Sequence, residues 1–153
     1  MVLSFPYFPI PFGTAIKPII PVVFISRTWE GRFLTYGALV DSGADCTTIT
    51  RAAAIDLGLV LEDDMVRTRG IGGTAEMKAT SCEIILGRGG EAYRLTIPIH
   101  VMAGKDVDLP FPLLGRKGVF ERFDITFRER KLRVDLSLKD ETLKRVRLPP
   151  ILK

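Results

Sequence analysis

One short segment of the 153-residue chain carries the residue types that acid–base chemistry needs. In "ALVDSGADCTTI", residues 38–49, Asp41 follows directly on an apolar run and is followed by small residues. A carboxylate beside a core costs free energy unless neighbouring groups satisfy it or function requires it. The segment therefore fits a loop built around Asp41 for a chemical purpose, although the same letters also occur in simple turns.

The residues around Asp41 predict strands, a short helix and a hairpin. Apolar runs at 21–26 and 32–40 favour two strands joined by a tight connection, the second of which ends at Asp41. Thr50 is expected to cap a short helix over residues 51–57, and Gly58 to end it in a left-handed conformation. Residues 61–86 predict a long hairpin whose tip is "GIGG".

The second half of the chain repeats part of this plan. A strand is expected over 91–102, a short helix over 116–122, and a strand pair or one bent strand over 124–136. The order of strand, "ALVDSGAD" and helix echoes the later order of strand, "FPLLGRKG" and helix. Strands dominate, so the fold class is all-β.

Composition describes an ordinary globular protein. The chain is 46% hydrophobic and 26% charged, and its formal net charge is +4. The densest basic runs, residues 128–133 and 139–147, are expected to be solvated faces without interleaved aromatic residues, so nucleic acid is not expected as a partner. The acidic cluster at 62–64 is expected to be a solvated loop, because its spacing matches no calcium loop.

Cysteine use and the N-terminus bear on the compartment. Cys46 and Cys82 cannot supply a dense disulfide framework and are expected to be small buried residues, and His100 a packed strand residue. The apolar N-terminus lacks a basic start, and its prolines exclude a continuous spanning helix. We therefore expect a cytoplasmic protein that makes no membrane contact.

Together, "LVDSGADCTTI", "GIGG" and "LLGRKGVF" resemble the retropepsin-like aspartic proteases, single-motif relatives of pepsin that include retroviral enzymes. The similarity spans residues 18–136 in element order. It implies a closed, retropepsin-like (acid protease) barrel with one or two short helices and a β-hairpin flap. It also implies an aspartic endopeptidase that acts on peptide or protein substrates.

Peptide hydrolysis by carboxylates needs two of them. One ionised group takes a proton from water while a protonated one polarises the scissile carbonyl. The chain has one Asp-Ser-Gly triplet, since Asp124 and Asp135 lack the motif. The second aspartate is therefore expected from a second copy, in a homodimer whose two-fold axis brings the identical residues together. No metal or cofactor is expected.

The resemblance assigns a role to each residue of the motif. Asp41 matches the catalytic aspartate, and Ser42 the hydroxyl-bearing position that in the family bonds across the dimer axis. Gly43 lets its backbone N–H approach the carboxylates closely. Ala44 matches a small residue near the substrate, and Asp45 an acidic residue that helps hold bound peptide in retroviral relatives.

The later motif is expected to support this loop. Arg116 stands where the family places an arginine that pairs with the acidic residue, which predicts an Asp45–Arg116 ion pair; the alternative is a surface pair worth about 0–1 kcal/mol. Leu113, Leu114 and Gly115 match the element behind the catalytic loop, and are otherwise simply the end of a buried strand.

The hairpin tip is expected to be a flap that closes over substrate, with an ordinary mobile hairpin as the alternative. The flap residues expected to contact substrate are Gly70, Ile71, Gly72 and Gly73.

The chain as a whole is expected to have three parts. The expected organisation is a Pro-rich arm over 1–17, the protease domain over 18–136 and a basic tail over 137–153. The arm also offers residues that such a protease accepts, so self-cleavage is an alternative role for it. The alternative function is a catalytically weak or inactive peptide-binding or dimerisation module with the same fold.

Overall fold

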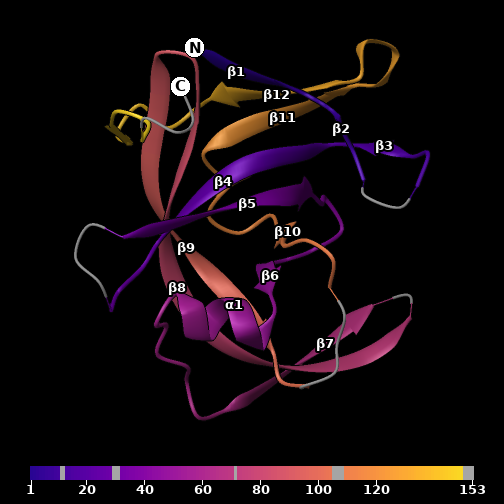
Figure 1. The fold of residues 1–153 in the computed structure, drawn as a ribbon, viewed down its shortest axis with the longest axis vertical. Coiled ribbons are helices and arrows are strands. Elements are labelled where there is room, and N and C mark those ends of the chain that lie inside the picture. Colours follow the sequence, from indigo (N-terminus) through magenta and orange to yellow (C-terminus); the bar gives the residue numbers. More distant parts are fainter. Residues whose placement is uncertain (11–12, 29–31, 71, 105–108, 150–153) are drawn as a thin grey trace.

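The computed structural model describes residues 1–10, 13–28, 32–70, 72–104 and 109–149. Within them the chain is almost entirely β, with short helices only (Figure 1). The elements before the long hairpin are β1 (Val2–Pro6), β2 (Phe8–Pro9), β3 (Ile16–Lys17), β4 (Ile19–Ile25), β5 (Phe33–Val40), β6 (Thr47–Ile49) and α1 (Arg51–Asp56). The later elements are β7 (Met65–Gly70), β8 (Gly73–Arg88), β9 (Glu91–Met102), β10 (Leu113–Leu114), β11 (Phe123–Arg128), the 3₁₀ turn η1 (Glu129–Lys131), β12 (Arg133–Leu138) and β13 (Lys144–Arg145).

The main sheet of the described residues pairs its strands in the order β13-β9-β6-β10-β5-β4-β8-β7. Because β8 also pairs with β9, the pairings run in a closed ring through β9, β6, β10, β5, β4 and β8. A second sheet has the order β1-β12-β11, and β2 and β3 form a small sheet of their own. The all-β prediction is confirmed.

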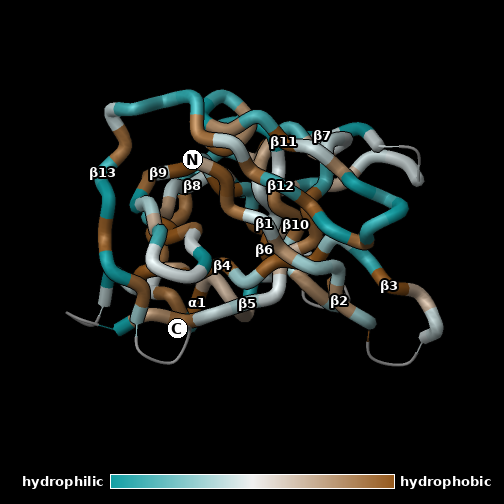
Figure 2. The backbone as a smooth tube through the Cα atoms, turned by 90° about the horizontal axis from the view of Figure 1, so that it is seen from above, coloured by the Kyte–Doolittle hydropathy of each residue, from teal (hydrophilic) through white to brown (hydrophobic). Residues whose placement is uncertain are grey.

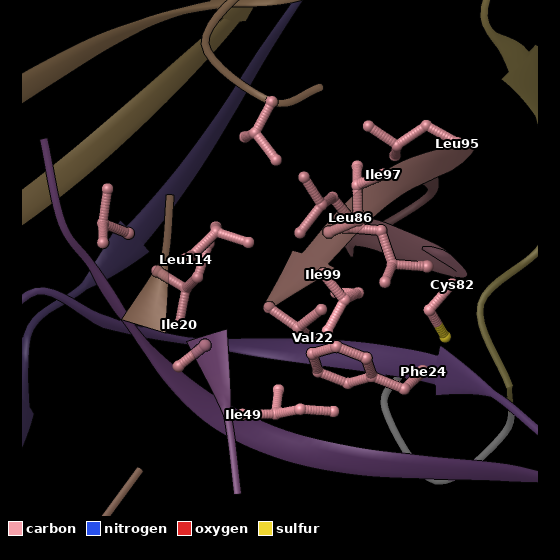
Figure 3. Close-up of a cluster of buried hydrophobic side chains, with 14 of the residues drawn as sticks. Ile20, Val22, Phe24, Ile49, Cys82, Leu86, Leu95, Ile97, Ile99 and Leu114 are labelled. Carbon is pink, nitrogen blue, oxygen red and sulfur yellow. The ribbon is translucent and has the colours of Figure 1, made fainter. Parts of the chain in front are cut away.

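Alternating apolar residues fill the space inside this ring. In β4, Ile20, Val22 and Phe24 are buried, and in β9 the side chains of Leu95 and Ile97 are buried from the opposite side (Figure 3). Period-two alternation is what places one face of each strand in the core. Further buried residues of the same cluster are Ile49, Cys82, Leu86, Ile99 and Leu114.

The helix expected after the Asp41 loop is present as α1. The Thr50 side chain accepts a hydrogen bond from the Ala53 N–H at 3.2 Å, which satisfies one of the free donors at the helix start. Gly58 follows with a φ of +63°, and a Cβ there would lie 2.2 Å from a side-chain atom of Thr28. The left-handed end expected at Gly58 is therefore confirmed.

The second expected helix is absent. Residues 117–122 form consecutive turns rather than a helix, although Phe120 N–H still donates to the Arg116 carbonyl at 2.9 Å. Gly118 has a φ of +81°, a left-handed conformation that interrupts a right-handed helix. The prediction of a helix over 116–122 is thus wrong, because the left-handed backbone at Gly118 breaks the right-handed path of the chain.

Both ends of the described chain pack against other elements. β1 pairs antiparallel with β12 over Val2–Pro6, and Leu3 and Phe5 are buried. Near the C-terminus, β13 pairs with β9, and Leu148 is buried in a small cluster with Val23.

In the described residues no helix is long and apolar enough to cross a membrane.

Candidate active site

Asp41 stands at the end of β5, where the chain leaves the sheet. Its backbone N–H donates to the Leu114 carbonyl at 3.0 Å, and the Leu39 N–H donates to the Pro112 carbonyl at 2.9 Å. β10 is parallel to β5 and antiparallel to β6, so it lies between the strands on either side of the Asp41 loop. A segment about seventy residues later in the sequence thus holds the backbone of Asp41.

The Asp41 carboxylate is oriented by its own loop. The Gly43 N–H donates to Asp41 Oδ1 at 2.9 Å, and the Ala44 N–H donates to the Asp41 carbonyl at 3.3 Å. A Cβ on Gly43 would lie 3.3 Å from the same Oδ1, so a side chain here would crowd the carboxylate. Asp41 is half-buried, while Ser42 is exposed, and its hydroxyl has no hydrogen-bond partner in the described part of the chain.

The loop is fastened to the segment after β10 at three further points. The Gly115 N–H donates to Thr47 Oγ1 at 3.1 Å in a buried position. The Arg116 N–H donates to the Ala44 carbonyl at 2.9 Å, and the Lys117 N–H to the Asp45 carbonyl at 2.7 Å. Leu114 is fully buried. The structure therefore brings the two motifs into direct contact.

Gly115 tolerates no side chain in this arrangement. A Cβ built on it would lie 2.3 Å from the Cys46 carbonyl carbon, 2.4 Å from its oxygen and 2.7 Å from the Thr47 nitrogen. All three atoms are backbone, which cannot swing aside as a side-chain end can. The close approach of two backbone segments explains the glycine.

The sequence motifs did not indicate a role for Thr47, although its hydroxyl accepts a hydrogen bond from the Gly115 N–H. It is fully buried at the start of β6. The signal that would have pointed to it is a run of threonines, "TTI", in a strand that is buried on every residue. A buried hydroxyl needs a hydrogen-bond partner, so such a residue indicates a specific contact.

Asp45 and Arg116 line one pocket of about 330 Å³ together with Lys117, Phe120 and Glu121. Their side chains form no ion pair within 4.0 Å in the described part of the chain. The backbone of the two segments is joined instead, through Lys117 N–H and the Asp45 carbonyl. The predicted Asp45–Arg116 ion pair remains a prediction.

The "GIGG" hairpin is present as β7 and β8, with Gly70 opposite Gly73 in the register. Gly73 has a φ of +122°, which suits glycine, and Cβ atoms at Gly70 and Gly72 would meet nothing within 4 Å. Ile71 lies outside the described residues. In Figure 1 this hairpin projects on the same side as the loop that joins β5 to β6. Closure over a substrate remains a prediction.

Neighbouring titratable groups offer no competing nucleophile. Burial raises the pKa of the Cys46 thiol, with opposed contributions from Lys117 and Asp45, so Cys46 stays protonated at neutral pH. Burial, then Lys117, lowers the pKa of His100, which pairs with Thr48 between β9 and β6. Both cysteines are free and buried, as expected. The described residues hold no group of three or more His, Cys, Asp or Glu able to bind a metal ion.

Comparisons with known proteins bear on this fold and on the Asp-Ser-Gly loop. Residues 26–87 match the aspartyl protease family model. A retropepsin-like aspartic protease from Rickettsia conorii has a similar crystal structure, with a TM-score of 0.52 and 19% identity. The likeness covers 89% of this chain and 91% of that one. No curated protein matches the sequence.

The family resemblance seen in the sequence is therefore confirmed. The chain has a retropepsin-like fold, and the segment that contains Asp41 and the hairpin matches the aspartyl protease family model.

Proposed function

We propose that the protein is an aspartic endopeptidase whose catalytic pair is formed by Asp41 of two copies of the chain. The observation that carries the proposal is the Asp41 loop. Its carboxylate accepts the Gly43 N–H at 2.9 Å, and its backbone is held by Leu114. One chain supplies one such carboxylate, and the family match and fold support the use of two.

In the proposed reaction the ionised Asp41 takes a proton from a water molecule while the water oxygen bonds to the scissile carbonyl carbon. The protonated Asp41 of the second copy gives its proton to the carbonyl oxygen. Two like charges this close cannot both be ionised, so the pair holds one proton between them. The tetrahedral intermediate then collapses: the first Asp41 gives the proton it took from water to the amine nitrogen as the C–N bond breaks, and the second Asp41 takes a proton back from a hydroxyl of the intermediate, which becomes the product acid.

Substrate is proposed to bind as an extended strand under the β7–β8 hairpin. Glycines at positions 70, 72 and 73 leave the backbone of the hairpin open to hydrogen bonding with the substrate. Closure of the hairpin over the substrate would exclude water. The exposed Ser42 hydroxyl is free to bond across the dimer axis, as in the family. The free cysteines fit a reducing compartment such as the cytoplasm.

The test is cleavage of denatured casein from acidic to neutral pH by the wild type and by Asp41→Asn. Cleavage that Asp41→Asn abolishes, with the melting temperature retained, is the expected result. Cleavage that persists in Asp41→Asn would overturn the role of the aspartate. Peptide binding by both proteins without cleavage by either would instead support the alternative, a peptide-binding module with this fold.

A further inference from the structure

The two larger sheets separate at the first half of β4 and leave a pocket between them. β4 pairs with β5 over all of its residues, but with β8 only at Val23 and Phe24. β1 is an edge strand of the second sheet. The pocket that β1, β2 and β4 enclose has a volume of about 390 Å³. That volume lies within the range of about 300–1,000 Å³ that is usual for ligand pockets.

Apolar side chains line this pocket on both sides. β1 and β2 contribute Phe5, Pro6 and Phe8, and β4 contributes Ile19 and Pro21. Phe5 is fully buried, whereas Phe8 is 59% exposed. Pro6 and Pro21 have no N–H, so neither strand offers a backbone donor there to an added strand. The lining therefore suits a compact apolar group rather than a further β-strand.

One cation faces these apolar residues. The guanidinium of Arg88, at the end of β8, lines the pocket and lies 5.8 Å from the centroid of the Phe5 ring. Figure 1 shows the upper end of the β8–β9 hairpin beside the N-terminus, and Figure 2 shows the same neighbours from above. A guanidinium that stacks on a ring keeps its N–H donors at the edge, where they can bind a carboxylate through two parallel hydrogen bonds.

No carboxylate in the described part of the chain neutralises Arg88. Its side chain forms no ion pair within 4.0 Å among these residues. Its cross-strand partner is Glu91, but that carboxylate binds Arg145 and accepts a hydrogen bond from the Tyr93 hydroxyl at 3.2 Å. The residues that line the pocket include no acidic one. Arg88 is therefore available to an anion from outside the chain.

Gly37 leaves space beside the pocket in the middle of β5. A glycine weakens the interior of a strand and often marks a place where a ligand or another backbone approaches closely. Apart from the chain neighbours of Gly37, the one described atom within 4 Å of a Cβ built on it is Ile19 Cγ2, at 3.0 Å. No close backbone thus explains this glycine. Because Gly37 lines the pocket, a larger side chain there would narrow it.

We propose that this pocket, here called the Arg88 pocket, binds a small apolar carboxylate. The apolar part lies between β1 and β4, and the carboxylate binds the Arg88 guanidinium. The Arg88 pocket shares no lining residue with the Asp41 loop or with the segment after β10, so it is a separate site. Two sources supply this chemistry: a free aliphatic acid, and the C-terminal residue of a peptide that ends in an apolar side chain.

The direct test is calorimetric titration of octanoate into the full chain, with octanol as the uncharged ligand of equal chain length. One saturable octanoate site per chain is expected, and octanol should bind roughly tenfold more weakly or worse, because it lacks the charged hydrogen bond. Each buried methylene tightens binding about fourfold, so hexanoate should bind about 15-fold more weakly than octanoate. The lack of a saturable octanoate site, or equal affinities for octanoate and octanol, would overturn the inference.

Two variants and a matched control assign the bound octanoate to this pocket. Arg88→Gln should weaken octanoate binding roughly tenfold or more and change octanol binding little. Gly37→Leu should weaken the binding of both ligands, because its side chain fills the space. Arg51→Gln should change neither, since Arg51 is an exposed arginine on α1 that lines a different hollow.

Thermal melts establish that each variant folds, and Arg88→Gln alone decides the outcome if Gly37→Leu does not fold. Wild-type octanoate affinity in folded Arg88→Gln, or an equal loss of affinity in Arg51→Gln, would contradict the assignment.

A pair of peptides separates the two sources of the ligand. N-acetyl-Ala-Ala-Leu is titrated as the free acid and as the C-terminal amide into Asp41→Asn, so that cleavage makes no contribution. Binding of the acid but not of the amide would identify a peptide C-terminus as a ligand, and binding of octanoate alone would identify a free aliphatic acid. Equal affinities for the acid and the amide would contradict the role of Arg88.

These results are independent of the proposed function. A protein that binds octanoate at this pocket but cleaves no casein would keep the Arg88 pocket and overturn the protease. A protein that cleaves casein but binds none of these ligands would overturn only the Arg88 pocket.

Discussion

Replacing Gly115 by alanine should damage the active site and the fold together. The new Cβ would lie 2.3 Å from the Cys46 carbonyl carbon, where van der Waals contact begins near 3.4 Å. The two backbone segments would have to separate by about 1 Å. That movement would also stretch the buried bond from the Gly115 N–H to Thr47 Oγ1, now 3.1 Å long.

The expected cost follows from these two effects. Overpacking typically costs about 1–3 kcal/mol, and a buried hydrogen bond left unmade about 1–3 kcal/mol, so we expect about 2–6 kcal/mol in total. For a chain of this size that lowers Tm by roughly 4–24 °C, at about 2–4 °C per kcal/mol. Because misplacement of a catalytic group by about 1 Å costs on the order of 100-fold in rate, casein cleavage should fall at least that far.

Thermal melts and cleavage rates at one protein concentration measure both effects, since dissociation of a dimer also shifts Tm. Gly90→Ala is the control, because a Cβ there meets nothing within 4 Å. It should leave Tm and activity unchanged. A Gly115→Ala protein that melts within 2 °C of the wild type and cleaves normally would show that the two backbones are not in the close contact described here.

Three further predictions concern Thr50 at the start of α1, the buried carboxylate of Asp135 and the thiol of Cys82. Thr50→Ala should lower the free energy of unfolding by about 1 kcal/mol and Thr50→Ser by less, as chemical denaturation would measure. Hydrogen bonds from Ser4 and Arg128 lower the pKa of Asp135, so its stabilisation is present above the unfolded-state pKa of about 3.8 and is lost as pH falls through the lower folded value. Asp135→Asn should therefore flatten the loss of stability in acid, and an unchanged acid profile would contradict that sign. Burial raises the pKa of Cys82 to about 11, so its thiol should react with Ellman's reagent only after unfolding.

Local signals in the sequence were sufficient to predict the strand before Asp41 and the helix after it. An apolar run before Asp41, a capping threonine and a helix-ending glycine each act over a few residues, and β5 and α1 follow them closely. The turn at 117–122 shows the limit of propensity, because one left-handed glycine outweighed several helix-forming neighbours.

Contacts between distant segments could not be predicted in the same way. The sequence contains no sign that Gly115 lies against the Cys46 backbone, or that Thr47 supplies the hydroxyl for its N–H. Nor does it indicate that β1 pairs with β12. Such contacts depend on strand order and register. Many segments of this chain share the same alternating apolar pattern, so the pattern alone does not determine which strands pair or in which register.

The pairing of β1 with β12 has a consequence for how the chain is made. During synthesis Leu3 and Phe5 leave the ribosome long before their partners in β12, which lie about 130 residues later. The Asp41 loop likewise waits for β10. Folding that depends on such distant pairings is slow, and the backbone of Asp41 lacks its hydrogen bond to the Leu114 carbonyl until residue 114 has emerged. The candidate site is therefore organised only after both of its distant halves have been translated.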